Sequence, residues 1–270
     1  MTYANILVAV DFAEATPDRV RLAAALARRF DATLTGAAAA EVPAPLFAHD
    51  IRDAQAQYER AKVTILQELE RAEAVFARCA GAAPRTVWSG GTDRPFAHLV
   101  DKGRAADLIV IGGTGETEID PSPFGVAVAP VLMEAGRPVL VVPQQHAGEP
   151  GRRIVVAWKD TPEARRAVSG ALPLVRSAEH VFVVTTGPGA RLEGADEVSD
   201  HLRLHGATVT THLLTTAVSD GEEILRFARD QQADLIVMGA YGHSRLREWA
   251  FGGATRDVLR AASLCSLMAH

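Results

Sequence analysis

The stretch ADLIVIGG at residues 106–113 occurs a second time in the chain, as ADLIVMGA at residues 233–240, 127 positions further along. In both copies an aspartate precedes a run of four apolar residues, and a glycine follows it. A short apolar run with such borders is typical of a parallel β-strand that is buried on both faces. The duplication therefore predicts two copies of one α/β unit within the 270 residues.

The similarity extends to both ends of the unit. NILVAVD at 5–11 is echoed by RIVVAWK at 153–159, and PVLVVP at 138–143 is matched by CSLMAH at 265–270. The second pair keeps the offset of 127, whereas the first pair is 148 apart, so the first copy carries 21 extra residues (148 − 127). We place these residues in the long periodic segment 50–79, because the second copy has only a short segment there.

Each copy has the pattern of five strands alternating with four helices. The predicted strands are 6–10, 33–38, 85–88, 108–111 and 139–142, then 154–157, 180–185, 208–214, 235–238 and 264–268. The predicted helices are 17–30, 50–79, 94–104 and 125–136, then 162–176, 193–205, 221–231 and 252–262. We expect an α/β fold of two tandem doubly wound domains, 1–145 and 153–270, each with a five-stranded, mostly parallel sheet and flanking helices.

The composition narrows the classes of partner. The net charge of −5 and the isoelectric point of about 6.0 lack the basic balance of a general nucleic-acid binder. The two cysteines form no CxxC pair, which argues against a disulfide framework or a structural zinc and suits a reducing compartment. No apolar run approaches the about 18 residues of a membrane span, and no signal-peptide pattern precedes the first strand. We expect a cytoplasmic protein with neither a membrane nor a nucleic-acid partner.

The glycines after the fourth strand of the second copy predict a ligand site. In open α/β sheets, ligands bind beyond the carboxyl ends of the strands, where the strand order reverses. Gly239 and Gly242 follow the strand, and Gly252 and Gly253 open the next helix. Glycine has no Cβ to keep phosphate oxygens from the backbone, and a helix N-terminus offers unpaired N–H groups to an anion. Taken alone, these glycines also fit a helix C-cap and a tight turn.

Side chains in and after this loop fit the same chemistry. His243 and Arg245 lie between the glycine pairs and would not repel phosphate. Ala254 and Thr255 fall in the first turn of the following helix, where Thr255 adds a hydroxyl donor. The loop therefore predicts a phosphate cradle in the C-terminal half.

This spacing, Gly-x2-Gly-x9-Gly-Gly after ADLIVMG, resembles the nucleotide signature of the universal stress protein family, G-x2-G-x9-G-(S/T). The resemblance covers both halves, so the chain looks like a tandem universal stress protein. It implies five-stranded α/β domains that pair side by side, in a family with members that bind ATP and members that do not. Gly253 replaces the signature's Ser or Thr, and we expect the hydroxyl of Thr255 to compensate.

The same resemblance implies an adenine contact by an acidic residue at the end of the first strand. Asp11 matches it in the first half, but Lys159 stands there in the second. Lys159 would reach a phosphate or be a solvated loop residue, and both interpretations stay open. Val183 and Val184 are expected to flank the base, although valine at such a position is also an ordinary core residue, and Ala157 at the end of the first strand is a further expected nucleotide contact.

The first half keeps the glycine spacing but not its chemistry. Gly112, Gly115 and Gly125 follow the pattern, and Val126 replaces the hydroxyl residue. The loop ETEIDPSPF carries three carboxylates, two prolines and no base, so it would repel a triphosphate. We predict an asymmetric protein in which the second half binds nucleotide if either half does.

Two further features have ordinary interpretations. The segment SGGTDRP at 89–95 is similar to the SGGxDS loop of ATP pyrophosphatases, but it follows the third strand and ends in Arg94-Pro95. We interpret it as a turn into a helix, with Thr92 or Asp93 as the N-cap. The histidines, His98 among them, show no pairing with a serine or cysteine nucleophile, and neither GxSxG nor HExxH occurs.

The expected function is a stress-response protein that binds an adenine nucleotide, ATP with an accompanying Mg²⁺ ion, in its C-terminal half as a regulatory module. Hydrolysis needs a positioned water or base and a metal ligand, for which Asp160 is the one candidate. A slow ATPase and an interaction protein without nucleotide binding stay open as alternatives. The halves are expected to pair through their last strands, and exposed sheet edges would also permit a homodimer.

Overall fold

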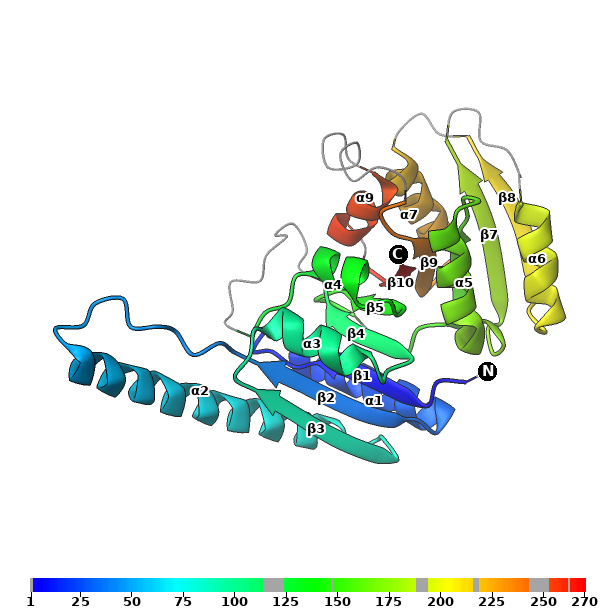
Figure 1. Cartoon of the computed structure of the whole chain (residues 1–270). Helices are drawn as coiled ribbons and strands as arrows, with labels where there is room; N and C mark the ends of the chain where they lie inside the picture. The colour runs from blue at the N-terminus through cyan, green and yellow to red at the C-terminus, as the bar shows by residue number, and fades with distance from the viewer. Residues whose placement is uncertain are drawn as a thin grey trace.

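The computed structural model describes residues 2–113, 124–146, 148–187, 194–215, 219–242, 253–261 and 263–270. Its strands form one ten-stranded sheet in the order β3-β2-β1-β4-β5-β10-β9-β6-β7-β8 (Figure 1). The first five are β1 (Asn5–Ala9), β2 (Thr33–Ala39), β3 (Arg85–Gly91), β4 (Leu108–Gly112) and β5 (Val139–Val142). The second five are β6 (Arg153–Ala157), β7 (His180–Thr186), β8 (Val209–Leu214), β9 (Leu235–Gly239) and β10 (Cys265–Ala269).

The two halves repeat one topology and meet at the centre of the sheet. Within each half the paired strands are parallel, and the chain reverses the strand order between its first and fourth strands. At the junction β10 pairs with β5 antiparallel, with Leu267 opposite Leu140. The α/β prediction with two tandem units is confirmed, and the pairing of the last strands joins the two sheets into one. The carboxyl ends of the two sets of strands therefore lie at opposite ends of the sheet.

Helices cover both faces of the sheet. The described helices of the first half are α1 (Thr16–Phe30), α2 (Ile51–Cys79), α3 (Pro95–Gly103) and α4 (Val128–Glu134). Those of the second half are α5 (Pro162–Val175), α6 (Ala195–Leu204), α7 (Asp220–Asp230) and α9 (Ala254–Ala261). Successive strand residues point to opposite faces, so Ile6 and Val8 join the core under α1, α2, α5 and α6, while Leu7 and Ala9 join the core under the other four helices.

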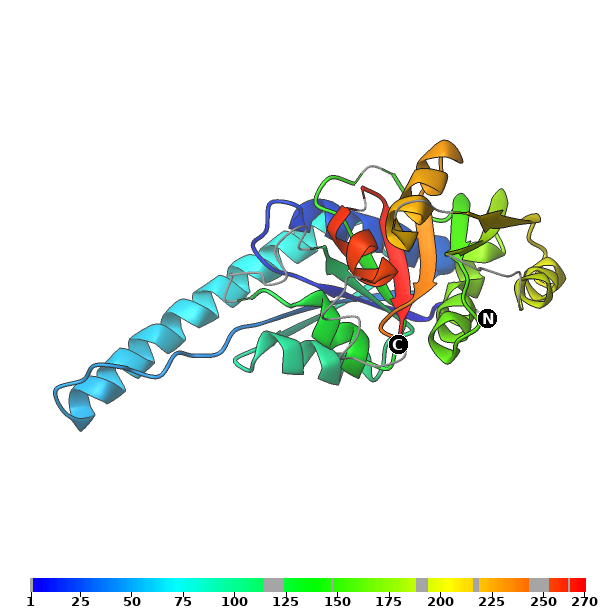
Figure 2. The same cartoon turned by 90° about the horizontal axis from the view of Figure 1, so that it is seen from above.

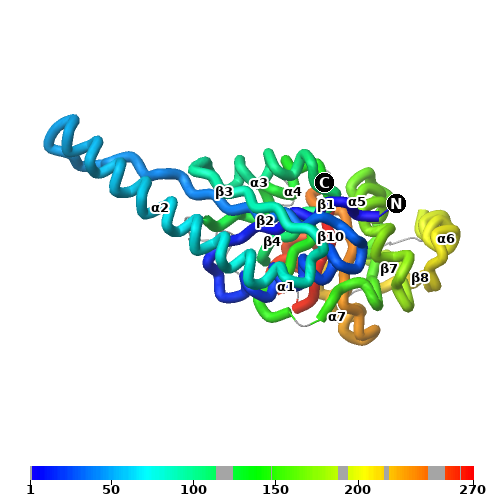
Figure 3. Tube along the Cα trace, turned by 90° about the horizontal axis from the view of Figure 1, so that it is seen from below, coloured from blue at the N-terminus to red at the C-terminus, as the bar shows by residue number. Residues whose placement is uncertain are grey.

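The extra residues of the first half form an arm. Helix α2 has 29 residues, and its buried side chains begin only at Ile65. The preceding part of the helix and the segment 41–50 extend away from the sheet in all three views (Figures 1, 2 and 3). Leu46, Phe47 and Ile51 near the arm's tip are 85–88% exposed. Large apolar side chains at the outer end of the arm are therefore exposed to solvent among the described residues.

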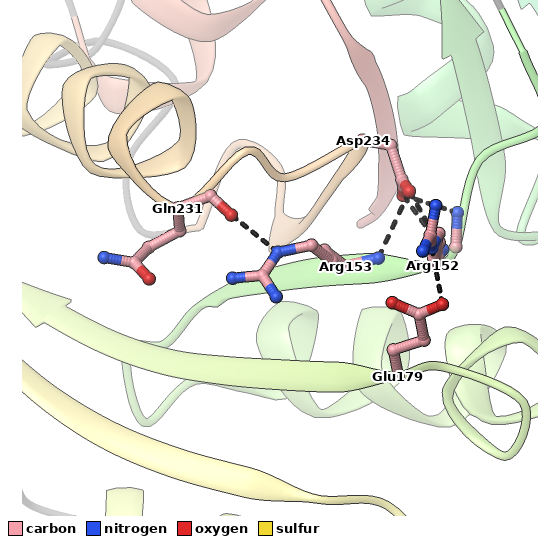
Figure 4. Close-up of polar contacts among 6 residues, drawn as sticks. Arg152, Arg153, Glu179, Gln231 and Asp234 are labelled. Carbon is pink, nitrogen blue, oxygen red and sulfur yellow. Dashed lines mark hydrogen bonds and ion pairs between the residues drawn. The ribbon is translucent and has the colours of Figure 1, made fainter.

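A repeated aspartate ties the start of the second half together. The carboxylate of Asp234 accepts hydrogen bonds from the backbone amides of Gly151 at 2.7 Å, Arg152 at 3.0 Å and Arg153 at 3.2 Å (Figure 4). The Arg153 side chain donates to the carbonyl of Gln231 at 2.6 Å. These bonds hold the entry to β6 against the entry to β9.

The equivalent residue of the first half makes the same kind of contact. Asp107, 127 positions before Asp234, accepts from the amides of Ala4 at 2.7 Å and Asn5 at 3.0 Å. Hydrogen bonds to a charged acceptor are stronger than neutral ones. The repeated aspartate is therefore a structural clasp between the first and fourth strands of each half.

Side chains also cross between the halves beside the central strands. The hydroxyl of Tyr3 donates to the carbonyl of Gly170 in α5 at 2.6 Å, and its ring packs edge-on against Phe30. Arg29 donates to the carbonyl of Pro150 at 3.2 Å.

Among the helices of the described ranges, none has the length and apolar character needed to cross a bilayer.

Candidate nucleotide site

The strand order of the second half reverses between β6 and β9, and Gly239 lies at the end of β9. A Cβ at Gly239 would lie 2.6 Å from the amide nitrogen of Ala164 and 2.9 Å from the carbonyl carbon of Glu163. The end of β9 therefore packs directly on the first turn of α5. This close packing requires glycine at 239 whether or not a ligand binds. The sequence pattern did not reveal this second reason for the glycine.

Glu163 places a carboxylate beside the next glycine. A Cβ at Gly242 would lie 3.0 Å from Glu163 Oε2. This oxygen is buried and has no hydrogen-bond partner within the described ranges, while Oε1 accepts from Arg166 at 3.2 Å. Burial by itself raises the pKa of this carboxyl, but the nearby amide of Glu163 itself, the Thr161 hydroxyl and the charges of Arg166 and His270 outweigh burial and lower the pKa. Glu163 thus places a charged acceptor, with Oε2 free of a partner in the described ranges, beside Gly242.

The residues predicted to contact the nucleotide near the ends of β6 and β7 have different surroundings. Ala157 is half-buried at the end of β6 and pairs in register with Val184. Val184 is fully buried in the core that also contains Ile224 of α7. Lys159 is exposed in the loop after β6, where its carbonyl accepts from the amide of Thr161 at 2.7 Å. Of the three, Ala157 and Lys159 reach the surface near the strand end, whereas Val184 supports it from beneath.

The predicted helix start lies at the expected position. The carbonyl of Gly253 accepts from the amides of Arg256 and Asp257 at 2.9 and 3.1 Å, so α9 begins with Ala254. Thr255 is buried in its first turn. His243, Arg245 and Gly252, the other predicted ligand residues, lie outside the described residues.

Asp160, the candidate for positioning a metal or water, is already engaged by a cation. Its carboxylate accepts from Arg165 Nε at 3.1 Å and Nη2 at 2.5 Å, and both side chains are more than a third exposed. Within the ranges given above, no three His, Cys, Asp or Glu side chains gather as metal ligands would. The geometry of Asp160 is that of a surface ion pair at the start of α5.

A buried ion pair lies at the strand reversal of the first half. Asp11, which matches the family's adenine contact, accepts from Arg19 Nη2 at 2.7 Å and from the hydroxyl of Thr16. Arg19 is 2% exposed and also donates to the carbonyl of Ala9 at 3.1 Å. A Cβ at Gly112 would lie 2.2 Å from Arg19 Nη1. The guanidinium therefore occupies the point of strand reversal in the first half.

Two expectations for segment 89–98 are wrong. The N-cap of α3 is Arg94, which makes no side-chain cap bond, so neither Thr92 nor Asp93 caps this helix. The carboxylate of Asp93 instead lies 3.4 Å from His98 Nδ1, and Ser89 Oγ lies 3.1 Å from His98 Nε2. His98 therefore does pair with a serine. One sequence feature could have predicted this contact. The connection from β3 through a short turn into α3 brings position 98 back over position 89.

Comparison with known proteins gives one curated relative and solved structures with the same fold. Universal stress protein Slr1230 from Synechocystis sp. (strain ATCC 27184 / PCC 6803 / Kazusa) is 29% identical over 165 residues, which cover 58% of this chain and 56% of that protein. The chain thus spans about half the length of this curated relative. A universal stress protein from Archaeoglobus fulgidus DSM 4304 has the same fold, with a TM-score of 0.68 and 16% identity over 98% of this chain and 95% of its own.

A functionally unknown protein, PA1789, from Pseudomonas aeruginosa PAO1 also has this fold, with a TM-score of 0.56 and 16% identity over 98% of this chain and 92% of its own. The model of the universal stress protein family matches the chain twice, at residues 2–143 and at residues 151–268. The two matches span nearly all of the chain and coincide with the two halves of the sheet. The chain belongs to the universal stress protein family.

Proposed function

We propose that this chain is a cytoplasmic stress-response protein with domains 1–145 and 153–270, and that the second domain binds ATP as a regulatory module. The observation that carries the proposal is the buried oxygen Glu163 Oε2 beside Gly242, which has no hydrogen-bond donor within the described ranges. A buried acceptor without a partner is costly. A ribose hydroxyl is a donor that would satisfy it.

The charges assign an orientation to the nucleotide. A carboxylate at Glu163 favours the sugar and repels phosphates, so the phosphates lie away from it. The start of α9 at Gly253 and Ala254 offers backbone N–H groups and positive partial charge. The proposed ligand therefore spans the crevice from the start of α5 to the start of α9, with Mg²⁺ carried on its phosphates.

The first domain supports the proposed asymmetry. Arg19 and Asp11 satisfy each other at the strand reversal, so the acid that would contact adenine is not available to a ligand. The ion pair between Asp160 and Arg165 in the second domain does not favour hydrolysis. ATP occupancy would then act as a state that selects a partner, as binding energy shifts a conformational equilibrium.

Calorimetric titration of the full chain with Mg-ATP and, separately, with inorganic tripolyphosphate tests the proposal. Glu163→Ala should weaken ATP binding about tenfold, equivalent to about 1.4 kcal/mol, without weakening tripolyphosphate binding, because tripolyphosphate has no ribose. Glu222→Ala is the matched control, since Glu222 is an exposed acid in the first turn of α7. Equal losses for ATP and tripolyphosphate would contradict the ribose contact.

Mass spectrometry of small molecules released from the purified protein separates the alternatives. Released ATP supports the proposed module. A protein that releases no nucleotide and gives no heat with ATP would instead be an interaction protein of this fold. ATP turnover that Asp160→Ala abolishes would identify a slow ATPase.

A further inference from the structure

The side chains of Ser89, His98 and Asp93 form a row of contacts at the outer edge of the first half, with His98 in the middle. Ser89 Oγ in β3 is 3.1 Å from Nε2 of His98 in α3, and Nδ1 of the same ring is 3.4 Å from the carboxylate of Asp93. A hydroxyl, an imidazole and a carboxylate in this order can activate the hydroxyl as a nucleophile. The residues of the proposed nucleotide site in the second half, Glu163 among them, take no part in this group.

Gly91 leaves room for the imidazole ring of His98. A Cβ at Gly91 would lie 2.7 Å from both Cε1 and Nδ1 of His98, so a larger residue at 91 would displace the ring. His98 is only 7% exposed. Its Nε2 also lies 3.1 Å from the carbonyl oxygen of Ser89. That carbonyl can accept a hydrogen bond from Nε2 once the ring has taken a proton, and Asp93 faces the Nδ1 proton at the same time.

Ser89 lies near a small apolar depression, on whose wall His98 is found. Strand β3 is the edge strand of the sheet, and Ser89 is half-buried in it. Its register partner on β2 is Ala37, so the two side chains point to the same face of the sheet. Beside them is a depression at the ends of β1 and β2, lined by Ala37, His98, Leu99 and Phe124 among others. Apart from the histidine, these lining side chains are apolar, so an acyl group on Ser89 would have apolar neighbours.

We propose that Ser89 is an acyl-transfer nucleophile toward short-chain esters, with His98 as its general base and Asp93 as a positioning residue. Ser89 Oγ forms a bond to the ester carbonyl carbon while its proton moves to His98 Nε2. The bond from that carbon to the alkoxy oxygen breaks, and the leaving alcohol takes the proton from His98. Water then adds to the acyl carbon through the same base, which releases the carboxylic acid and restores the serine.

The three residues contribute unequally. His98 is buried and contacts the serine, so its loss removes the base. Asp93 is 71% exposed, and its contact with Nδ1 is long at 3.4 Å. Water therefore competes for the same position, and we expect Asp93→Asn to slow the reaction by less than about fivefold, against about a hundredfold for His98→Gln.

A fluorophosphonate probe on the full chain tests the assignment, because an activated serine displaces its fluoride and forms an oxygen–phosphorus bond. Peptide mapping by mass spectrometry should locate the label on Ser89 ahead of every other serine of the same molecule. Ser89→Ala should abolish the label, whereas Ser169→Ala, at an exposed serine of α5, should not. Absence of label from Ser89 in the folded wild-type chain would overturn the proposal without any variant.

The base is tested by chemical rescue. His98→Ala should lose labelling at Ser89, and added imidazole should restore it, which a purely structural role of His98 would not produce. Wild-type labelling should also be slowed by butyrate esters that compete for the depression. A His98→Ala protein that is folded by circular dichroism and labels at the wild-type rate would refute the role of His98.

Discussion

The guanidinium of Arg19 donates a hydrogen bond to the carboxylate of Asp11 at 2.7 Å, and both groups are at least 90% buried. Removing one partner of such a pair strands the other charge in the interior, at a cost of about 3–5 kcal/mol. We expect Arg19→Met to lower the free energy of unfolding by an amount at the lower end of this range, because Thr16 and the amide of Ala13 still donate to Asp11.

Urea denaturation measures this loss. Arg21→Met is the matched control, since Arg21 forms an ion pair with Asp18 in which both side chains are more than half exposed. Breaking an exposed pair should cost less than about 1 kcal/mol. Similar losses for the two variants would show that Arg19 stabilises the fold by packing and not by its charge.

Glycine 239 provides a second test. An added methyl group would meet the backbone of α5 at 2.6 Å, and backbone yields less readily than a flexible side chain. Gly239→Ala should destabilise the apoprotein by about 1–3 kcal/mol, measured as a fall in the midpoint of thermal unfolding without nucleotide. Gly81→Ala, where nothing lies within 4 Å of the added Cβ, should be neutral. An unchanged midpoint for Gly239→Ala would mean that this glycine serves only the ligand.

Two histidines on the outer strands of the second half predict a dependence of stability on pH. Burial, followed by the charge of Arg153, lowers the pKa of His180. Burial, followed by His180, lowers the pKa of His212. When the folded pKa is below the unfolded value, the unfolded chain binds protons more tightly, so stability is full above the ordinary histidine pKa of 6.5 and falls as the pH drops through it.

The double variant His180→Gln/His212→Gln should therefore lose less stability than the wild type between pH 7.5 and pH 5. The measurement is the midpoint of urea unfolding at each pH, and the difference between the two proteins removes the contribution of the carboxylates. His49→Gln, at an exposed histidine near the arm's tip, is the control. Parallel curves for the wild type and the double variant would refute this assignment.

The clasp at Asp234 predicts a stability effect far from any ligand site. Its carboxylate serves three backbone amides, whereas Asp107 serves two. Asp234→Ala should cost about 2 kcal/mol, within the usual range for hydrogen bonds to a charged group, and at least as much as Asp107→Ala. Asp230→Ala at the end of α7 is a nearby control that makes no such contacts among the described residues. Hydrogen exchange at the amides of Arg152 and Arg153 would show whether the clasp has opened.

The order of strands and helices could be predicted because it depends on local periodicity and on the internal repeat. The helix predicted at 50–79 is observed as Ile51–Cys79, with Asp50 as its cap, and the strand predicted at 108–111 extends by one residue to Gly112. The residues that cap helices after a turn were harder to predict. The N-cap predicted at Thr92 or Asp93 failed because Asp93 faces His98 instead, a contact that depends on the path of the whole turn.

The candidate sites show the limit of sequence patterns more clearly. Gly239 fits a phosphate loop and a close-packed strand end equally well, and only the position of α5 reveals the packing requirement. Arg19 lies on a helix with apolar spacing, so nothing in the pattern indicates that its side chain turns back to Asp11. Glu163 similarly resembles an ordinary acid in a first helical turn. Long side chains that reach between elements escape any argument from spacing.

The antiparallel junction of β5 and β10 gives the molecule two opposite ends. At one end the strands of the first half finish, and at the other end those of the second half finish. The arm belongs to the first of these ends, because the segment that leads to it leaves the carboxyl end of β2 (Figure 1). One end therefore projects the arm with its exposed Leu46, Phe47 and Ile51, while the opposite end carries Gly239 and the start of α9, so the two surfaces can be reached at the same time.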